Sequence, residues 1–515
     1  MQAQSPYPPV DIPNVDLWSL LFEKKKRLFA DDKGYDIPRC RHSPLLHLFP
    51  FQVKSIALDF GKGLKATWNW QKGDVLALLS PNDIDIPPVI WGTHWPGGAV
   101  TLVNLTYTAE ELSLQLKGTK ARVLVTQIFP AQRGIAKRAS IQRRIWRFSF
   151  SSGTTGIPKG VMLSHRNIVS NIIQITAGEE HHLSCAGGKD RNGDKVLAFL
   201  PFFHIYGLSC LVHKSMYTGI QLVVMSKSDI KKWCAHVQNF GITFSYIVPP
   251  VAVLLSKHSI VEEYDLPSLR LMNSGATPLS RELVNAVYAR IKTGVKQGYG
   301  LSETSPTTHT QAWGDWNKFI GSEIKYMTSP DDGSEPVELH VGRTGEIYVR
   351  GPNVFLGYLN NPEATAACLS QDGWFRTGDV GHQDEHGNLY ITDRVKERIK
   401  YKGFQVAPAE LEGVLVENEL IANVAVIGVE SEVHGSEVPR AFVVLSGKKV
   451  EDGTAADAEQ IVQWLAGKVA PHKRLRGGVR FVHEIPKSAS GKILRRVLKD
   501  RARKEDTVER LKAKL

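Results

Sequence analysis

Short apolar runs separated by helix-like segments restrict the fold of this chain more than any other feature. Strand-length runs rich in Val, Ile, Leu and Phe recur along its first part: DVLALLSP, ARVLVTQ, VLAFLPFF, IQLVVMS, FSYIVP and LRLMNSG. Continuous apolar strands that alternate with helices are typical of parallel sheets buried on both faces. We therefore expect an α/β fold with much parallel sheet.

The pattern changes from about residue 335. Here GEIYVRG, GNLYITDR and RAFVVLSG are short strands bounded by turn signals, and a small α+β unit follows. A chain of 515 residues is too long for a single hydrophobic core. The sequence predicts a large domain over residues 1–392 and a small domain over residues 393–515, with the boundary near Asp393 in the charged stretch DRVKERIKYKG.

Composition narrows the classes of partner. The formal net charge of +12 suits anionic ligands, and no Lys/Arg block interleaved with aromatic residues points to nucleic acid. The five cysteines are scattered without a CxxC, which predicts neither a disulfide framework nor a Cys-rich metal site and fits a reducing compartment. The first residues lack the pattern of a signal peptide. No membrane span is expected, because the best candidate, ITFSYIVPPVAVLL, fits a strand, a turn and a helix start better.

The last three residues are Ala513, Lys514 and Leu515, a conservative variant of the Ser-Lys-Leu peroxisomal address. The alternative is a basic helix that happens to end in these residues. The preceding segment KEDTVERLKAKL is amphipathic and leaves them on an exposed terminus, which favours the address. We expect recognition by the peroxisomal import receptor and a peroxisomal location, with the cytoplasm as the other possibility.

The segment SSGTTGIPKG, from Ser151 to Gly160, combines glycines, hydroxyl groups and one lysine. It follows a short strand-like run and precedes an apolar helix that begins near Ser164. Glycines let backbone N–H groups turn toward a ligand, hydroxyls add donors, and Lys159 adds a mobile charge, which is how a loop holds phosphate. The lysine is not placed as in a Walker A motif. A solvated Gly/Ser loop is the plainer alternative.

Six further segments accompany this loop: LPFFHIYGL (200–208), NSGATPLS (273–280), QGYGLSET (297–304), GWFRTGD (373–379), DRVKERIKYKGFQVAPAELE (393–412) and PKSASGKILRR (486–496). In this order they resemble the adenylate-forming acyl-CoA synthetases, near the 4-coumarate–CoA ligase and fungal acyl-CoA ligase branch. The resemblance runs from about Lys54 to the C-terminus. It implies a large N-terminal domain of mixed and parallel sheets with a small β-barrel-like subdomain, and a mobile α+β C-terminal domain.

The resemblance also implies the reaction. A carboxylate attacks the α-phosphate of ATP to give an acyl-adenylate and pyrophosphate, and the thiol of coenzyme A then displaces AMP. Both steps concern anions, so cations, backbone donors and a metal ligand are the groups required. ATP, Mg²⁺, coenzyme A and a carboxylic acid are the ligands expected.

Site residues for the nucleotide follow from the matching motifs. They comprise the phosphate loop (Ser151, Ser152, Gly153, Thr154, Thr155, Gly156, Lys159), the Mg²⁺ ligand Glu303, the α-phosphate contact Thr304, the adenine slot (Gly275, Ala276, Gln297, Gly298, Tyr299) and the ribose contacts Asp379 and Arg394. Magnesium takes carboxylate oxygen, and an acceptor carboxylate suits a vicinal diol. The alternatives are a helix-capping role for Glu303 and an Asx turn for Asp379.

Lys492 occupies the place of the family's adenylation lysine, where its cation would steady the carboxylate and the charge that develops on the α-phosphate. His204 would shape the pocket or admit the thiol, although a packed core histidine is the alternative. Asp393 would be the pivot of a domain rotation that exchanges Lys492 for the second-step residues. These are Lys400, Lys402, Gly403 and Gln405, of which the lysines could instead be exposed cations.

The acyl pocket is expected to be apolar or small-sided, with contributions from Tyr206, Cys210, Tyr246, Ile247, Val248, Asn273, Gly275 and Gly300. No cation is evident that could pair a second carboxylate. This composition favours an aryl, cinnamyl or medium-chain fatty acid over a dicarboxylate or an amino acid.

The chain departs from the family pattern near residues 38–52, 127–147 and 321–326, which are short or altered. These departures bear on activity more than on fold. Two other functions are therefore open: adenylation that loads a separate carrier protein, and adenylate binding without catalysis. Intact Lys492, Glu303 and phosphate loop argue against the second. A luciferase-like oxygenase is a remote third possibility.

Overall fold

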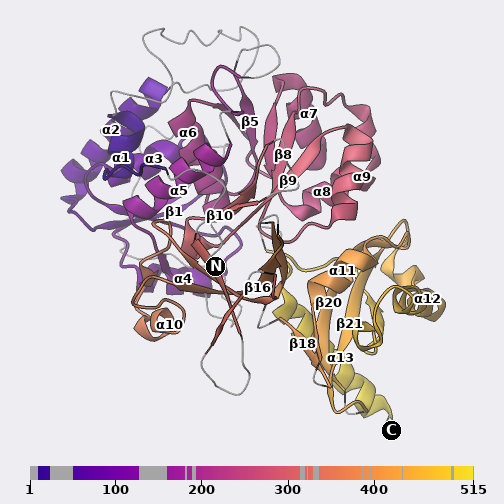
Figure 1. Cartoon of the computed structure of the whole chain (residues 1–515). Coiled ribbons are helices and arrows are strands. Elements are labelled where there is room, and N and C mark those ends of the chain that lie inside the picture. The colour runs from indigo at the N-terminus through magenta and orange to yellow at the C-terminus, as the bar shows by residue number, and fades with distance from the viewer. Residues whose placement is uncertain are drawn as a thin grey trace.

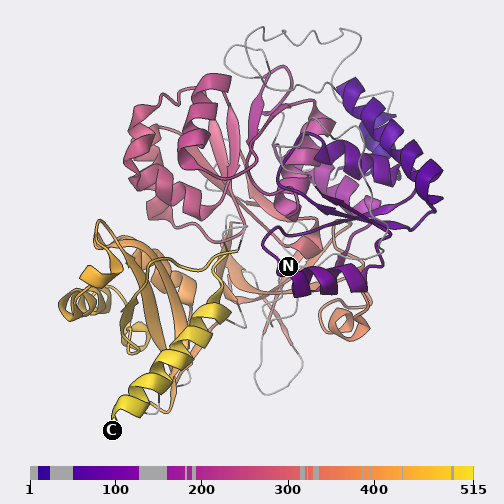
Figure 2. The same ribbon diagram turned by 180° about the vertical axis from the view of Figure 1, so that it is seen from behind.

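The computed structural model describes residues 10–23, 50–126, 159–179, 182–187, 193–313, 319–321, 323–328, 336–340, 342–385, 388–394, 397–402, 404–431, 433–488 and 492–513. Figure 1 shows a large body that contains the indigo to salmon segments, and a smaller orange and yellow body beside it. Seen from behind in Figure 2, the last helix runs along the smaller body to the C-terminus.

The first layer of the large body is a three-stranded parallel sheet in the order β2-β1-β3. Its elements, with the helices near it, are α1 (Leu17–Phe22), α2 (Pro50–Trp68), β1 (Val75–Leu79), α3 (Ile86–His94), β2 (Ala99–Leu102), α4 (Ala109–Gly118) and β3 (Val123–Thr126). Helices α2 and α3 cross closely at two glycines. A Cβ on Gly61 would lie 2.6 Å from the carbonyl oxygen of Gly92, so a larger residue would push the helices apart.

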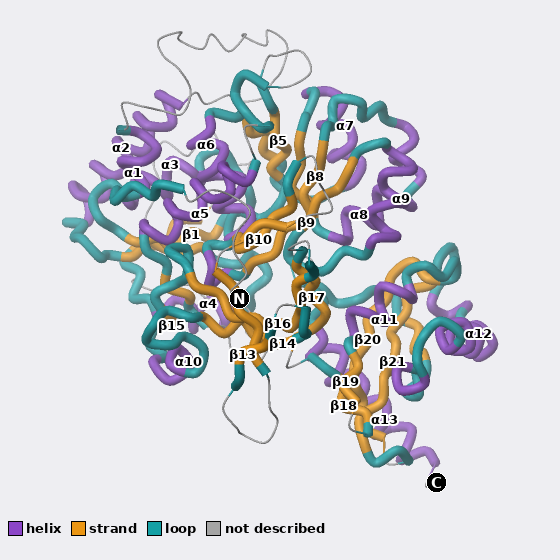
Figure 3. The backbone as a smooth tube through the Cα atoms, viewed as in Figure 1, coloured by secondary structure: helices purple, strands orange, loops and turns teal. Residues whose placement is uncertain are grey.

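The second layer is a seven-stranded sheet in the order β11-β10-β9-β8-β7-β5-β6. Strands β9, β8, β7, β5 and β6 run parallel to one another. At the other edge β10 is antiparallel to β9, and β11 is antiparallel to β10. The strands are β5 (Lys195–Ala198), β6 (Gln221–Val224), β7 (Phe244–Ile247), β8 (Leu271–Ser274), β9 (Gly294–Gly300), β10 (Thr307–Gln311) and β11 (Phe319–Gly321). The apolar runs of the sequence thus form the predicted parallel sheet, which Figure 3 shows with helices α7, α8 and α9 to one side.

The helical segments of this layer are α5 (His165–Gly178), the π-helix η2 (Gly207–His213), α6 (Lys214–Thr218), α7 (Ile230–Phe240), α8 (Pro249–Lys257), η3 (Ser259–Glu263) and α9 (Arg281–Ile291). Helix α5 begins where the sequence predicted. The hydroxyl of Ser164 accepts from the backbone N–H of Asn167, and the Asn167 side chain accepts from the N–H of Ser164. This reciprocal cap satisfies two backbone donors that helix geometry leaves unpaired.

The third layer is a five-stranded antiparallel sheet in the order β13-β12-β14-β16-β17, which corresponds to the expected β-barrel-like part. Its strands and neighbours are β4 (Val161–Met162), η4 (Ser302–Thr304), β12 (Glu323–Met327), β13 (Glu338–Leu339), β14 (Gly345–Arg350), β15 (Gly357–Tyr358), α10 (Pro362–Ala366), β16 (Phe375–Gln383) and β17 (Leu389–Arg394). The short stretch 321–326 forms the end of β11 and most of β12, so it links the second sheet directly to the third.

The small body has a hydrophobic core of its own that includes buried residues from Ile399 to Ala502. Its elements are β18 (Ile399–Tyr401), β19 (Phe404–Val406), α11 (Pro408–Leu415), β20 (Ile421–Ser431), β21 (Ser436–Leu445), η5 (Val450–Asp452), α12 (Ala455–Ala466), η6 (Pro471–Lys473), β22 (Val479–Phe481) and α13 (Arg495–Ala513). The expected small α+β C-terminal unit is present. The boundary and pivot at Asp393 stay predictions.

Across the described ranges, none of the helices is both long and apolar enough to cross a lipid bilayer. The candidate stretch of the sequence instead forms strand β7 and the beginning of α8, as predicted.

Candidate active site

A cavity of about 910 Å³ opens where the three sheets and the small body meet. Residues of α5, of β9 and of the loop before η2 line it, and so do residues of β16, β17 and the segment that carries Lys492. Segments far apart in the sequence therefore contribute to one space. Its size and its mixed lining suit an organic ligand with polar groups.

A buried carboxylate joins two strands at one end of the cavity, which we call the nucleotide end after the ligand that the sequence predicts there. Asp379 of β16 lies directly opposite Arg394 of β17, and its Oδ1 is 2.7 Å from the Arg394 Nε. The hydroxyl of Tyr299, at the end of β9, donates to Oδ2 at 2.8 Å. Burial raises the pKa of Asp379 and raises that of Tyr299 well above 10. Tyr299 is thus a permanent donor to this carboxylate.

Lys492 lies at the same end, although it belongs to the small body. Its Nζ is 4.0 Å from Glu397 Oε1. Burial and, next, the Arg394 guanidinium lower the pKa of Lys492 to about 8. Arg495 fixes Glu397 in turn with an ion pair of 2.8 Å and also pairs with Glu412. The ammonium is therefore held in place and stays largely protonated at neutral pH.

Glu303 lies on the short turn η4 and lines the cavity. The Tyr358 hydroxyl donates to its Oε1 at 2.9 Å, and Lys159 Nζ stands 4.9 Å from the centre of the Tyr358 ring. Burial raises the pKa of Glu303 above its usual value. A carboxylate and a lysine thus face the same part of the cavity.

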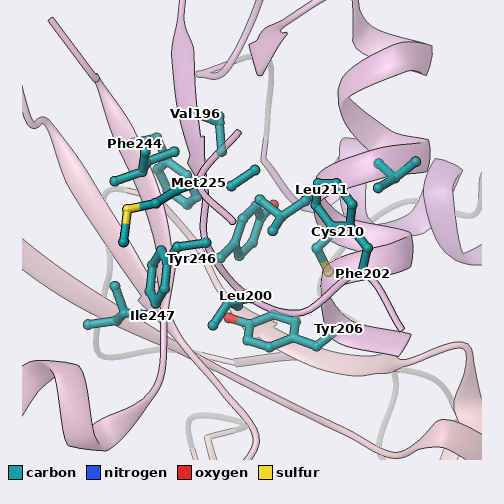
Figure 4. Packing of buried hydrophobic residues seen from close by; sticks show 14 of the residues in the cluster. Val196, Leu200, Phe202, Tyr206, Cys210, Leu211, Met225, Phe244, Tyr246 and Ile247 are labelled. Atoms are coloured by element: carbon teal, nitrogen blue, oxygen red, sulfur yellow. The ribbon is translucent and has the colours of Figure 1, made fainter. Parts of the chain in front are cut away.

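The wall opposite combines bare backbone with aromatic rings. A Cβ on Gly275 would come within 3.0 Å of the Tyr206 ring, and one on Gly300 would collide with the carbonyl oxygen of Pro306 at 1.9 Å. The Tyr206 hydroxyl donates to the backbone oxygen of Asn273 at 3.0 Å, and its ring meets Tyr246 edge to face at 5.7 Å. Figure 4 shows Tyr206, Tyr246 and Cys210 among these packed side chains. A larger residue at Gly300 would therefore collide with backbone, and one at Gly275 would press on the Tyr206 ring.

Comparison with known proteins identifies the family of this chain. The AMP-binding enzyme family matches residues 144–359, and the AMP-binding enzyme C-terminal domain matches residues 410–492. A probable 4-coumarate–CoA ligase 2 of Dictyostelium discoideum is 36% identical over 491 residues, with 84% of this chain and 86% of that protein covered. The 4-coumarate–CoA ligase 5 of Oryza sativa subsp. japonica is 35% identical, with 83% and 84% covered. This chain belongs to the AMP-binding enzyme family and to its 4-coumarate–CoA ligase-like branch.

Solved structures agree with that assignment. ATP-bound MatB from Rhodopseudomonas palustris superposes with a TM-score of 0.76 at 25% identity, covering 94% of this chain and 98% of that one. The anthranilate–CoA ligase AuaEII in complex with anthranoyl-AMP gives a TM-score of 0.75 at 22% identity, over 88% and 92% of the two chains, and shows the shared fold. The fold predicted from the sequence, that of the adenylate-forming enzymes, is confirmed.

Within this family framework, most of the predicted nucleotide residues with described positions gather in the cavity. Those that line it are Lys159, Gly275, Ala276, Gly298, Tyr299, Glu303, Asp379, Arg394 and Lys492, together with the pocket residues His204, Tyr206, Cys210, Tyr246, Asn273 and Gly300. Burial lowers the pKa of His204 to about 4, so its imidazole is neutral at physiological pH. It can shape the pocket or accept a hydrogen bond, but it supplies no charge there.

Four predicted residues do not line the cavity. The Thr304 hydroxyl bonds within its own turn to the carbonyl oxygens of Leu301 and Pro306, and Ser302 faces the cavity instead. The N–H of Gln297 donates to the Gln311 side chain. Val248 is buried in the core at the start of α8, as Ile247 is at the end of β7. Their predicted ligand contacts stay predictions.

Two of the residues predicted for the second half-reaction, Lys400 and Lys402, do not line the cavity. Lys400 is exposed on β18, and Lys402 is exposed beside it, with its Nζ 5.9 Å from the Tyr401 ring centre. Lys492, in contrast, is inside. The described arrangement therefore presents the residue predicted for adenylation and withholds the two lysines predicted for thioester formation.

Several predicted features fall outside the described residues. They are the phosphate loop (151–156), Gly403, the side chains of Asp393 and Gln405, the altered segments 127–147 and nearly all of 38–52, and the terminal Lys514 and Leu515.

Other cavity residues escaped the sequence analysis. Glu179 lines the far end of the cavity, where it pairs with Lys214 and Lys296, and Tyr358 caps Glu303. The sequence suggested no cation near the acyl pocket, whereas the structure places two buried lysines there. Neither lysine belongs to a fixed-spacing motif, so only the charge of Lys296 beside QGYG could have hinted at it.

Proposed function

We propose that this AMP-forming acid–CoA ligase uses ATP and Mg²⁺ to convert an aryl, cinnamyl or medium-chain fatty acid into its acyl-adenylate, and then transfers the acyl group to coenzyme A. The observation that carries the proposal is the single cavity that holds Lys492 and the Tyr299–Asp379–Arg394 group at one end and apolar and aromatic walls beyond it. Such a space accommodates an anionic nucleotide and an organic acid side by side.

In the first step a substrate carboxylate oxygen bonds to the α-phosphorus of ATP, and the bond to the bridging oxygen breaks to release pyrophosphate. Lys492 would neutralise the carboxylate as it approaches and the negative charge that develops on the α-phosphate. Asp379 would accept from the ribose hydroxyls, held in orientation by Tyr299 and Arg394. In the second step the coenzyme A sulfur attacks the acyl carbon and AMP leaves.

Magnesium fits the donor set. Among the described residues no group of three or more His, Cys, Asp or Glu side chains could hold a metal ion, so Glu303 would be a lone carboxylate ligand. Mg²⁺ is bound in this way in many phosphate sites, through one or two carboxylates, water and phosphate oxygens. The ion would neutralise charge on the departing pyrophosphate.

The test is exchange of labelled pyrophosphate into ATP with a panel of aryl, cinnamyl and fatty acids, followed by thioester formation with and without coenzyme A. Acid-dependent exchange and a coenzyme A thioester are expected. Failure to exchange with every acid would refute catalysis, and exchange without transfer to coenzyme A would favour loading of a carrier protein.

We also propose, from the terminal Ala513-Lys514-Leu515 alone, import into peroxisomes. A fluorescent protein fused to the N-terminus of the full chain should give peroxisomal puncta that vanish when Leu515 is deleted. Unchanged puncta after the deletion would place the address elsewhere.

A further inference from the structure

Three charged side chains are buried together at the far end of the cavity; we call them the Lys214–Glu179–Lys296 cluster. The Lys296 Nζ is 2.8 Å from Glu179 Oε2, and the Lys214 Nζ is 3.5 Å from Oε1. The side chains are 0–3% exposed. Lys214 Nζ also donates to the Tyr246 hydroxyl at 2.9 Å. Charges this deep in a protein require partners, because water no longer solvates them.

The cluster has more cations than anions. Two lysines face one glutamate, and the described neighbours add no negative charge: burial raises the pKa of the Cys210 thiol to about 12 and lowers that of His213 to about 3. Burial alone would raise the pKa of Glu179, but the two lysines outweigh it and hold that pKa below its usual value. Burial also lowers the pKa of Lys214. Among the described residues, two lysines therefore share this single carboxylate, and an anion bound beside Lys214 would favour its protonated form.

Helix α5 places this cluster with respect to the nucleotide end. Its N-cap, Ser164, lines the cavity close in sequence to Lys159, and Ile168 and Ile175 line it further along the same helix. Its C-cap, Glu179, lines the cavity as well. A helix of 14 residues is about 21 Å long, so the cavity extends from the phosphate side to the cluster. On β9, Lys296 precedes Tyr299 by three residues, about 10 Å along the strand.

Tyr246 connects the buried cation to the cavity. It lines the cavity, and its hydroxyl oxygen accepts from Lys214. No hydrogen bond from this hydroxyl to another described residue is present, so its proton remains available to a ligand. Burial raises the pKa of Tyr246 well above 10, so the proton is retained. A hydrogen bond that an ammonium polarises in a low-dielectric site is strengthened toward an anionic acceptor.

Building on the proposed function, we infer that the preferred acid carries a second anionic oxygen group, a carboxylate, at the end remote from the activated carboxyl, and that this group binds the Tyr246 hydroxyl beside Lys214. The second carboxylate would supply a further anion for Lys214, through the Tyr246 hydroxyl that Lys214 contacts. A neutral tail in the same place would offer neither Lys214 nor the Tyr246 hydroxyl an anionic partner. The substrate is thus an aryl, cinnamyl or medium-chain acid with a far-end carboxylate.

The test uses two matched pairs of acids in pyrophosphate exchange: octanedioic against octanoic acid, and 4-carboxycinnamic against 4-methylcinnamic acid. The dicarboxylate member of each pair should have the higher kcat/KM. We define the preference as the kcat/KM of the dicarboxylate divided by that of its monocarboxylate partner. In Lys214→Met this ratio should fall roughly 10- to 100-fold, the scale of a lost hydrogen bond to a charged group. Lys214→Met leaves Glu179 paired with Lys296 and keeps side-chain volume, so folding is expected. Tyr246→Phe should lower the ratio in the same direction.

The matched control is Lys195→Met. Lys195 begins β5, donates to the backbone oxygen of Phe240 and lies outside the cavity lining, yet its loss changes the net charge equally. The wild-type ratio should persist in this variant. Equal use of both members of each pair by the wild type would overturn the inference, as would a Lys214→Met variant that uses both members less efficiently by the same factor.

Calorimetric titration of the same acids into protein saturated with AMP separates this inference from the proposed function. If no acid supports exchange, the proposed function fails. Tighter binding of octanedioate than of octanoate that Lys214→Met abolishes would still support the inference. Equal binding of the two acids would refute it.

Discussion

The two ends of the cavity both contain buried charge, but they are built differently. At the nucleotide end Asp379 pairs with an arginine that is 32% exposed, and Lys492 comes from the small body. At the far end Glu179 pairs with two lysines that are almost fully buried, and all three residues come from the second layer of the large body. Water reaches the first group, and one of its members belongs to the other domain. The second is buried in the core of the large body, so water does not adjust it.

The largest effect we expect concerns stability at the far end. Glu179→Gln leaves two buried ammonium groups without an anion and should lower the free energy of unfolding by about 3–5 kcal/mol. Urea denaturation measures it, with the exposed Glu282→Gln on α9 as the control. Asp379→Asn should cost less stability, because water reaches Arg394. An equal loss in both variants would remove the distinction between the two ends.

Lys492→Ala should abolish most adenylation at the nucleotide end. Loss of an anchored cation beside a developing charge slows a reaction roughly 10²–10³-fold. Thioester formation from supplied acyl-AMP should be spared, because Lys400 and Lys402, not Lys492, are predicted to serve that step. Single-turnover measurement of each half-reaction decides this, and equal loss in both would contradict the division of labour.

The pH profile of adenylation should report the same lysine. The pKa of Lys492 is lowered to about 8, so the ammonium is present below that pH and is lost as pH rises through it. Exchange activity should therefore decline on the alkaline side with a midpoint near pH 8. In the Lys492→Arg variant the side chain stays charged across this pH range. Its exchange activity should therefore not decline near pH 8, whatever its absolute rate. Identical midpoints in both proteins would assign the limb to another group.

The smallest effect is expected for Tyr299→Phe. The change removes one hydrogen bond to Asp379 and leaves the Arg394 ion pair in place. A net cost of about 1 kcal/mol corresponds to a roughly fivefold higher KM for ATP. Tyr348→Phe on β14, outside the cavity lining, is the control. If the change raised only the KM for the acid, it would contradict the predicted nucleotide role of Tyr299 and indicate a contact with the acyl group.

The same contrast explains what the sequence could predict. Strands β5 to β8 were visible as apolar runs, because burial on both faces leaves a local signature. Asp379, Arg394 and Lys492 could be predicted because a nucleotide chemistry shared across the family fixes the motifs that contain them. The buried cluster brings together the C-cap of α5 (Glu179), helix α6 (Lys214) and strand β9 (Lys296). The contact between these elements depends on how the chain packs around the second sheet, and no spacing in the sequence predicts it. For Thr304 the motif predicts a hydroxyl that contacts the α-phosphate. In the structure this hydroxyl is hydrogen-bonded to the carbonyl oxygens of Leu301 and Pro306.

Helix α5 has a consequence for how such an enzyme can diversify. Its N-cap Ser164 lines the cavity near Lys159, and its C-cap Glu179 lines the cavity about 21 Å away, where we propose that the tail of the acid binds. Because the helix is a rigid spacer, substitutions around Glu179 can alter which tail is accepted while the reacting end keeps its geometry. Selection can therefore act on substrate choice and on chemistry as nearly independent traits of one gene.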